Sequence, residues 1–146
     1  MSLTNAAEAN LLNLIFLNVD WANIGDAAGL QNSAAAGSFH ISLHTADPGE
    51  VGSQTTSEIS YTGYGRVAVA RSAGGFTLTT STISNTALVQ FPQCTGGSGI
   101  ATHFGIGTDS SGAGNLLFKG SLTSSLSVSN GIQPQFAAGA LTVTVD

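Results

Sequence analysis

The chain has 146 residues, a length that suits a single domain over residues 1–146 with its own hydrophobic core. Only 8% of the residues are charged, against about 25% in ordinary soluble domains. Three cations and a net charge of −5 argue against direct nucleic-acid binding. The single Cys94 excludes an intrachain disulfide. No apolar run in the sequence is long enough to span a membrane.

The low charge has two interpretations that the composition leaves open. One is that partner proteins cover much of the surface, since an isolated small domain usually carries more charge for solubility. The other is that Ser, Thr, Asn, Gln and Gly form a neutral but soluble β surface. Cys94 is expected to be a small core side chain.

The first predicted element is a helix over residues 5–17. Thr4 is a suitable N-cap, and the stretch contains Ala, Glu and Leu but no Gly or Pro. Its apolar side chains form two neighbouring ridges, Leu11 with Leu14 and Ile15, and Leu12 with Phe16. Either the helix packs against the domain on one side and a neighbouring subunit on the other, or it covers one end of the β core.

Strand signals dominate after a Gly-, Ala- and Ser-rich loop expected at 25–37, which follows Trp21. The period-two alternation of residues 38–45 is typical of a strand. We expect about eight short strands, at 38–45, 66–71, 76–80, 87–91, 100–106, 116–122, 124–128 and 140–145. The sequence therefore predicts an all-β jelly roll or β-sandwich over residues 38–146, with one N-terminal helix.

Several connections carry turn signals. Asp47-Pro48-Gly49 combines a preset φ with a glycine, and Asn130-Gly131 is a second turn. Gly74-Gly75 predicts a hairpin between the strands on either side of it. The polar residues 50–60 predict a long exposed loop.

Catalytic and metal-binding patterns are weak. On a strand, His40 and His44 would lie about 13 Å apart, too far to share a metal. His103 has no local partner, and no Gly-x-Ser-x-Gly nucleophile motif occurs. Asp47 and Glu50 suit an exposed turn better than a Ca²⁺ loop. We therefore expect no catalytic residue, no metal ligand and no cofactor.

Residues 61–66, with the sequence YTGYGR, form the one notable local cluster. Tyr61, Tyr64 and Arg66 are residue types enriched where proteins contact proteins. In an equally supported alternative, the tyrosines fix the start of a strand to the core and Arg66 pairs with Glu58. The two interpretations remain open at this point.

Four segments resemble a family of small structural proteins of tailed phages and prophages. They are residues 42–49 (SLHTADPG), 61–69 (YTGYGRVAV), 103–107 (HFGIG) and 117–120 (LFKG), and the resemblance extends over roughly residues 5–145. Members of that family are labelled as tail-fibre or virion proteins. The closest functional picture it implies is a jelly-roll cement, or decoration, protein on the outside of the phage head.

This resemblance implies a non-enzymatic virion component that is synthesised in the bacterial cytoplasm. Its implied partners are the major capsid protein and further copies of itself, with a dimer favoured over a trimer. The alternatives are a tail or baseplate component that contacts the host surface and, less well supported, a small hydrolase. The residues expected at contacts with partners are Leu11, Leu14, Ile15, Trp21, Tyr61, Tyr64 and Arg66.

Overall fold

The computed structural model describes residues 2–25 and 29–145, so residues 26–28 of the predicted loop at 25–37 lie outside the described residues. The chain divides into two compact units. Unit 1 comprises the residues up to Ser38, Ala70–Leu88 and the residues from Phe136 onward. Unit 2 comprises Phe39–Val69 and Val89–Gln135. The expectation of a single domain over 1–146 stays a prediction.

The predicted N-terminal helix is confirmed in unit 1. Helix α1 spans Asn5–Leu12 and continues as the π-helical segment η1, Asn13–Leu17. Thr4 is the N-cap, and its hydroxyl accepts a hydrogen bond from the backbone N–H of Ala7. The helix ends at Asn18, which takes the left-handed conformation that suits a C-terminal cap. None of the helical segments among the described residues has the length and apolarity needed to cross a membrane.

One of the two predicted apolar ridges faces the core of unit 1. Leu12 and Phe16 are fully buried, and the Phe16 ring packs edge-to-face on Phe76 with 5.0 Å between the ring centroids. The other ridge is only partly buried, as Leu11, Leu14 and Ile15 show. The helix therefore covers the core through one ridge and leaves the second half-exposed.

Arg71 ties the end of this helix to the rest of unit 1. Its Nε donates to the carbonyl of Ile15 at 2.6 Å and its Nη2 to the carbonyl of Leu14 at 2.9 Å. Its Nη1 donates to the carbonyl of Ala36 at 3.0 Å. The last carbonyls of a helix lack partners within the helix and carry partial negative charge, so a guanidinium is a favourable cap there.

The sheet of unit 1 has the order β3-β4-β9, with bounds Phe76–Thr79, Thr82–Asn85 and Thr142–Thr144. Its strands pair antiparallel. The hairpin predicted at Gly74-Gly75 is wrong, because β3 pairs with β4 across a tight turn at Thr80 and Ser81. Strand β4 was not predicted. In the turn before β4, Thr80 has a φ of 55°, which is uncommon for Thr. A glycine or asparagine normally marks such a hairpin turn in a sequence, and neither is present here.

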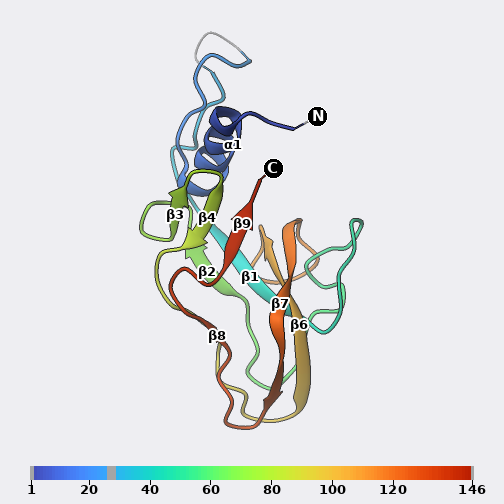
Figure 1. Ribbon diagram of the computed structural model, residues 1–146. Coiled ribbons are helices and arrows are strands. Elements are labelled where there is room, and N and C mark those ends of the chain that lie inside the picture. Colours follow the sequence, from blue (N-terminus) through green and yellow to red (C-terminus); the bar gives the residue numbers. More distant parts are fainter. Residues whose placement is uncertain (1, 26–28, 146) are drawn as a thin grey trace. The chain divides into compact units, whose positions relative to one another are not determined.

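The larger sheet belongs mainly to unit 2 and has the order β2-β1-β6-β7 (Figure 1). The bounds are Val67–Ala70 for β2, Ser38–His44 for β1, Ser98–Gly107 for β6 and Leu116–Ser129 for β7. A third sheet pairs β5, Val89–Gln90, with β8, Gln135–Phe136. The all-β class with one N-terminal helix is thus confirmed, as several antiparallel sheets.

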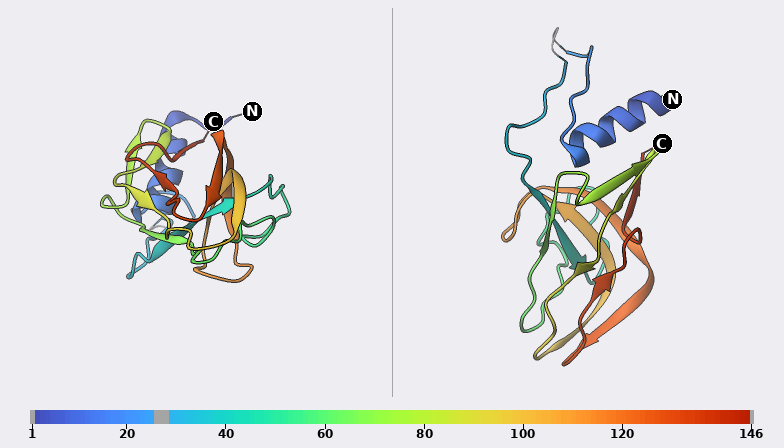
Figure 2. Two further views of the ribbon diagram at one scale, coloured as in Figure 1. Left: turned by 90° about the horizontal axis from the view of Figure 1, so that it is seen from below. Right: turned by 90° about the vertical axis from the view of Figure 1, so that its left-hand side faces the viewer.

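Strand β7 is one continuous element where the sequence predicted two strands at 116–122 and 124–128. Its antiparallel register with β6 breaks between Ala101, opposite Leu126, and His103, opposite Ser121. Across this break, an advance of two residues along β6 corresponds to an advance of five residues along β7. Both strands curve along their length (Figure 2). Bulges of this kind bend a strand while keeping it in the sheet.

Replacement of Arg71 by Gln tests the helix cap. We expect the free energy of unfolding to fall by about 2 kcal/mol, because carbonyls that had a charged donor lose it. The single Trp21 lies in unit 1, so its fluorescence during urea unfolding reports this change. Lys119→Gln removes the same charge from a partly exposed side chain in unit 2 that is far from the helix in sequence, and should leave the Trp21 transition in place. Equal midpoints for Arg71→Gln and wild type would contradict the role of the cap.

Candidate functional site

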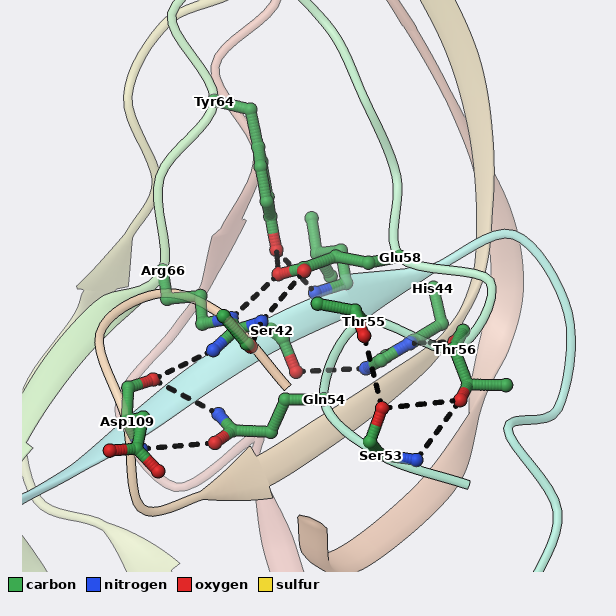
Figure 3. Close-up of polar contacts among 12 residues, drawn as sticks. Ser42, His44, Ser53, Gln54, Thr55, Thr56, Glu58, Tyr64, Arg66 and Asp109 are labelled. Atoms are coloured by element: carbon green, nitrogen blue, oxygen red, sulfur yellow. Dashed lines mark hydrogen bonds and ion pairs between the residues drawn. The ribbon is translucent and has the colours of Figure 1, made fainter. Parts of the chain in front are cut away.

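The candidate site lies in unit 2, where two loops meet. The long loop, residues 45–66, follows β1, and the short loop, residues 108–115, connects β6 to β7. The backbone N–H of Gln54 in the long loop donates to the carbonyl of Ala113 in the short loop at 2.8 Å. A set of side-chain contacts around this point fixes the two loops to each other (Figure 3).

Arg66 is the centre of these contacts. Its Nε and Nη2 donate to the two carboxylate oxygens of Glu58 at 2.7 and 2.8 Å, a bidentate ion pair within the long loop. Its Nη1 and Nη2 donate to the carbonyls of Asp109 and Gly112 in the short loop at 2.9 and 2.7 Å. The Arg66 side chain is only 2% exposed. The predicted pairing of Arg66 with Glu58 is therefore confirmed.

The two tyrosines support this arrangement from the long loop. Tyr64 donates its hydroxyl proton to Glu58 at 2.8 Å and accepts from the backbone N–H of Leu43 at 3.2 Å. Burial raises the pKa of the Tyr64 hydroxyl far above its ordinary value, so it stays a donor. Tyr61 is buried, packs edge-to-face on Tyr64 and donates to the carbonyl of Pro92 at 2.8 Å. Both tyrosines thus fix the loop to the core.

Gln54 is a fully buried amide at the junction of the two loops. Its Oε1 accepts from the backbone N–H of Asp109 at 3.0 Å, and its Nε2 donates to the carbonyl of the same residue at 3.2 Å. The side chain fills the space beside Gly107 and Gly114, where an added Cβ would meet it at 2.2 Å. The prediction of an exposed loop at 50–60 is wrong here, since Gln54 and Ile59 are buried.

His44 and Ser42 form a second buried contact under the long loop. The two side chains are fully buried, with 2.8 Å between Ser42 Oγ and His44 Nε2. His44 Nδ1 lies 2.9 Å from the carbonyl of Thr56, which can only accept, so Nδ1 carries the proton and Nε2 accepts from Ser42. The pair resembles a nucleophile with its base. Neither group has access to a substrate, so its role is to hold the loop.

A surface hollow of about 190 Å³ opens where the loops meet. It is lined by Glu58, Tyr64, Gly65, Arg66, Ser110, Ser111 and Gly112. Ser110 and Ser111 are exposed, whereas the Glu58 side chain is only 16% exposed. The hollow therefore presents exposed hydroxyls on one side and polar groups held by hydrogen bonds on the other.

A second hollow of about 300 Å³ lies beside the turn at Asp47-Pro48-Gly49. The predicted turn is confirmed by the 2.9 Å hydrogen bond from the backbone N–H of Gly49 to Asp47. That bond, helped by Lys119, holds the pKa of Asp47 below its ordinary value. Lys119 Nζ lies 3.0 Å from Asp47 and 3.1 Å from Glu50, so an ammonium group occupies the position that a Ca²⁺ ion would need. Among the described residues, no three His, Cys, Asp or Glu side chains gather as metal ligands.

The residues expected at partner contacts fall into two groups. Tyr61, Tyr64 and Arg66 come together in unit 2, where they organise the loops. Leu11, Leu14, Ile15 and Trp21 lie in unit 1 as partly buried side chains. Contact of these residues with a partner stays a prediction. Sequence reasoning missed Gln54, Ser110 and Ser111, for which no local pattern in the sequence gives a signal.

Substitution of Gly107 by Ala tests the packing of Gln54. The new methyl group would overlap the buried amide, so we expect the free energy of unfolding to fall by about 1–3 kcal/mol, as overpacking does. Gly65→Ala is the matched control, because its Cβ would meet only Pro92 at 3.9 Å. Chemical unfolding monitored by the two tyrosines, both in unit 2, measures the difference. A stability loss no larger than that of Gly65→Ala would show that Gln54 can move aside.

His44 makes the stability depend on pH. Burial lowers the pKa of His44 below its ordinary value of 6.5, so the unfolded chain takes up the proton first as the pH falls. The stability contributed by neutral His44 is complete above pH 6.5 and is lost as the pH falls below it, by at most about 1.4 kcal/mol per pH unit. Urea unfolding between pH 7.5 and 5.5 should show this slope in wild type and in His103→Gln. The same slope in His44→Gln would refute the assignment.

Comparison with known proteins bears on the expected function. The model of a family described as "Podophage GP4 fiber I protein gp80" matches residues 2–144. A search of curated proteins found no match. The family description names a fibre, so it supports the tail alternative over the capsid cement protein that we expected. It names no partner within the virion. Because the match covers nearly the whole chain, the protein belongs to the podophage fiber I protein gp80 family and is a structural component of the phage virion, not an enzyme.

Proposed function

We propose that the chain is a tail-fibre subunit that contacts the host cell and binds hydroxyl-rich surface polysaccharide in the hollow between its two loops. The observation that carries the proposal is the hollow lined by Tyr64, Ser110 and Ser111 beside the Glu58–Arg66 pair. Membership of a fibre family supports a position at the tail. The major capsid protein is not proposed as a partner.

The lining of the hollow has the chemistry that sugar hydroxyls need. A sugar hydroxyl both donates and accepts, and so do the exposed hydroxyls of Ser110 and Ser111. The Glu58 carboxylate can accept a further hydrogen bond, because each carboxylate oxygen has more than one acceptor position. Tyr64 also lines the hollow, so an aromatic side chain lies at the same place.

The loops are also joined to each other by hydrogen bonds in the absence of a ligand. Arg66 joins the loops through Asp109 and Gly112, and Gln54 joins them through Asp109 and Ala113. A binding surface that is already ordered loses little conformational entropy when it binds. A surface with few charges suits this role as well, because hydrogen bonds between uncharged groups depend little on the salt concentration outside the cell.

Filling the hollow tests the proposal. Ser111→Trp places a bulky side chain at its rim, and we expect at least a roughly tenfold loss of affinity, equal to about 1.4 kcal/mol, for surface polysaccharide extracted from the host bacterium. Binding is measured by titration of fluorescently labelled protein, with near-UV circular dichroism to confirm that the fold is retained.

Ser98→Trp is the matched control. Ser98 is exposed at the start of β6, whereas the short loop follows Gly107 at its end, about 30 Å away along the strand. Its affinity should equal that of wild type. Equal binding by Ser111→Trp, or undiminished binding to cells whose polysaccharide has been oxidised with periodate, would overturn the proposal.

A further inference from the structure

The ion pair beside the hollow presents its negative end to solvent. Glu58 and Arg66 both line the hollow (Figure 3). The Glu58 side chain is 16% exposed, whereas the Arg66 side chain is only 2% exposed. A ligand in the hollow therefore has better access to the carboxylate than to the guanidinium that neutralises it.

The hydrogen-bond donors of this wall are mostly used within the protein. Four of the five N–H groups of Arg66 donate to the Glu58 carboxylate and to the carbonyls of Asp109 and Gly112. Tyr64 donates its hydroxyl proton to Glu58 as well. These side chains therefore have little donor capacity left for a ligand.

Acceptor positions remain on the same wall. A carboxylate has about four acceptor positions, and three of those on Glu58 are filled, two on Oε1 and one on Oε2. A carbonyl oxygen has two such positions, and Arg66 fills one of them at Gly112. The ligand group that fits is one that donates, such as a sugar hydroxyl. An ionised acid can only accept.

The charges around the hollow also disfavour an anion. Unit 2 contains four acidic and two basic side chains. Arg66 is paired with Glu58, and Lys119 is held by Asp47 and Glu50, so unit 2, all of which the structure describes, has no basic side chain outside these pairs. The pKa of Arg66 is raised mainly by its hydrogen bond to Glu58, and the charge of the exposed Asp109 adds to this effect. A second carboxylate is therefore within electrostatic reach of the hollow.

We infer that the hollow selects glycans by charge: it binds uncharged sugar units through their hydroxyls and excludes acidic units that carry carboxylate or phosphate groups. This inference rests on the proposed polysaccharide binding and adds the class of sugar to it. Like charges brought together at a binding surface are unfavourable, and they are a common means of rejecting a wrong ligand. Glu58 is the residue that supplies this repulsion at the hollow.

Conversion of the primary hydroxyl groups of the host polysaccharide to carboxylates tests the inference. Oxidation with TEMPO does this and leaves the sugar rings intact. The affinity of the wild-type protein, measured by the same fluorescence titration, should fall at least about tenfold. Methyl esterification of the new carboxylates removes their charge without restoring the hydroxyls, so it should restore the affinity. An ester that binds as weakly as the free acid would overturn the inference, because the lost hydroxyls would then explain the effect.

A charge variant at the rim assigns the repulsion to the hollow. Ser110 lines the hollow, so Ser110→Lys places an ammonium group there and should raise the affinity for the oxidised polysaccharide about tenfold. This gain should shrink at high salt, which screens exposed charges. Ser98→Lys is the matched control, because it adds the same charge at the start of β6 and should give no gain. No gain in Ser110→Lys, or an equal gain in Ser98→Lys, would overturn the assignment.

The same titrations separate this inference from the proposed function. If the wild-type protein binds neither the native nor the oxidised polysaccharide, polysaccharide binding itself is wrong. If it binds both equally well and Ser111→Trp weakens both, polysaccharide binding stands and the selection by charge is wrong. Strong binding to the native form alone, with recovery in the ester, supports both.

Discussion

The buried guanidinium of Arg66 is the interaction on which the loops of unit 2 depend. A charge this well shielded from solvent is tolerable only when it is paired and its donors are satisfied. Glu58 supplies the opposite charge, and the carbonyls of Asp109 and Gly112 take the remaining hydrogen bonds. The same contacts that stabilise the ion therefore hold the two loops together and define the hollow between them.

The other two cations of the chain are also used internally. Arg71 caps the helix of unit 1, and Lys119 pairs with Asp47 and Glu50 in unit 2. All three basic side chains of the sequence therefore stabilise the loops and the helix end of the protein itself. Because the chain has few charged residues, many of its polar contacts are hydrogen bonds made by amides and hydroxyls. The hydrogen bonds of Gln54 to Asp109 are an example.

Such neutral contacts give the protein a surface suited to a virion component. Hydrogen bonds of hydroxyls and amides are less sensitive to salt than exposed ion pairs are. The hollow between the two loops of unit 2 uses this chemistry, because it presents polar groups held by hydrogen bonds to a ligand.

The sequence by itself determined the features that arise from neighbouring residues. The sequence predicted the helix at 5–17 and the β structure of the remainder. It also indicated the pairing of Arg66 with Glu58 as one of two alternatives. These features could be predicted because caps, periodicity and short spacings involve residues that are close together in the sequence. Only the tertiary structure decided that Leu12 and Phe16 form the buried ridge, that β3 pairs with β4, and that Gln54 is buried. These outcomes depend on contacts with residues far away in the chain: the space for Gln54 exists because Gly107 and Gly114, more than fifty residues later, have no side chains.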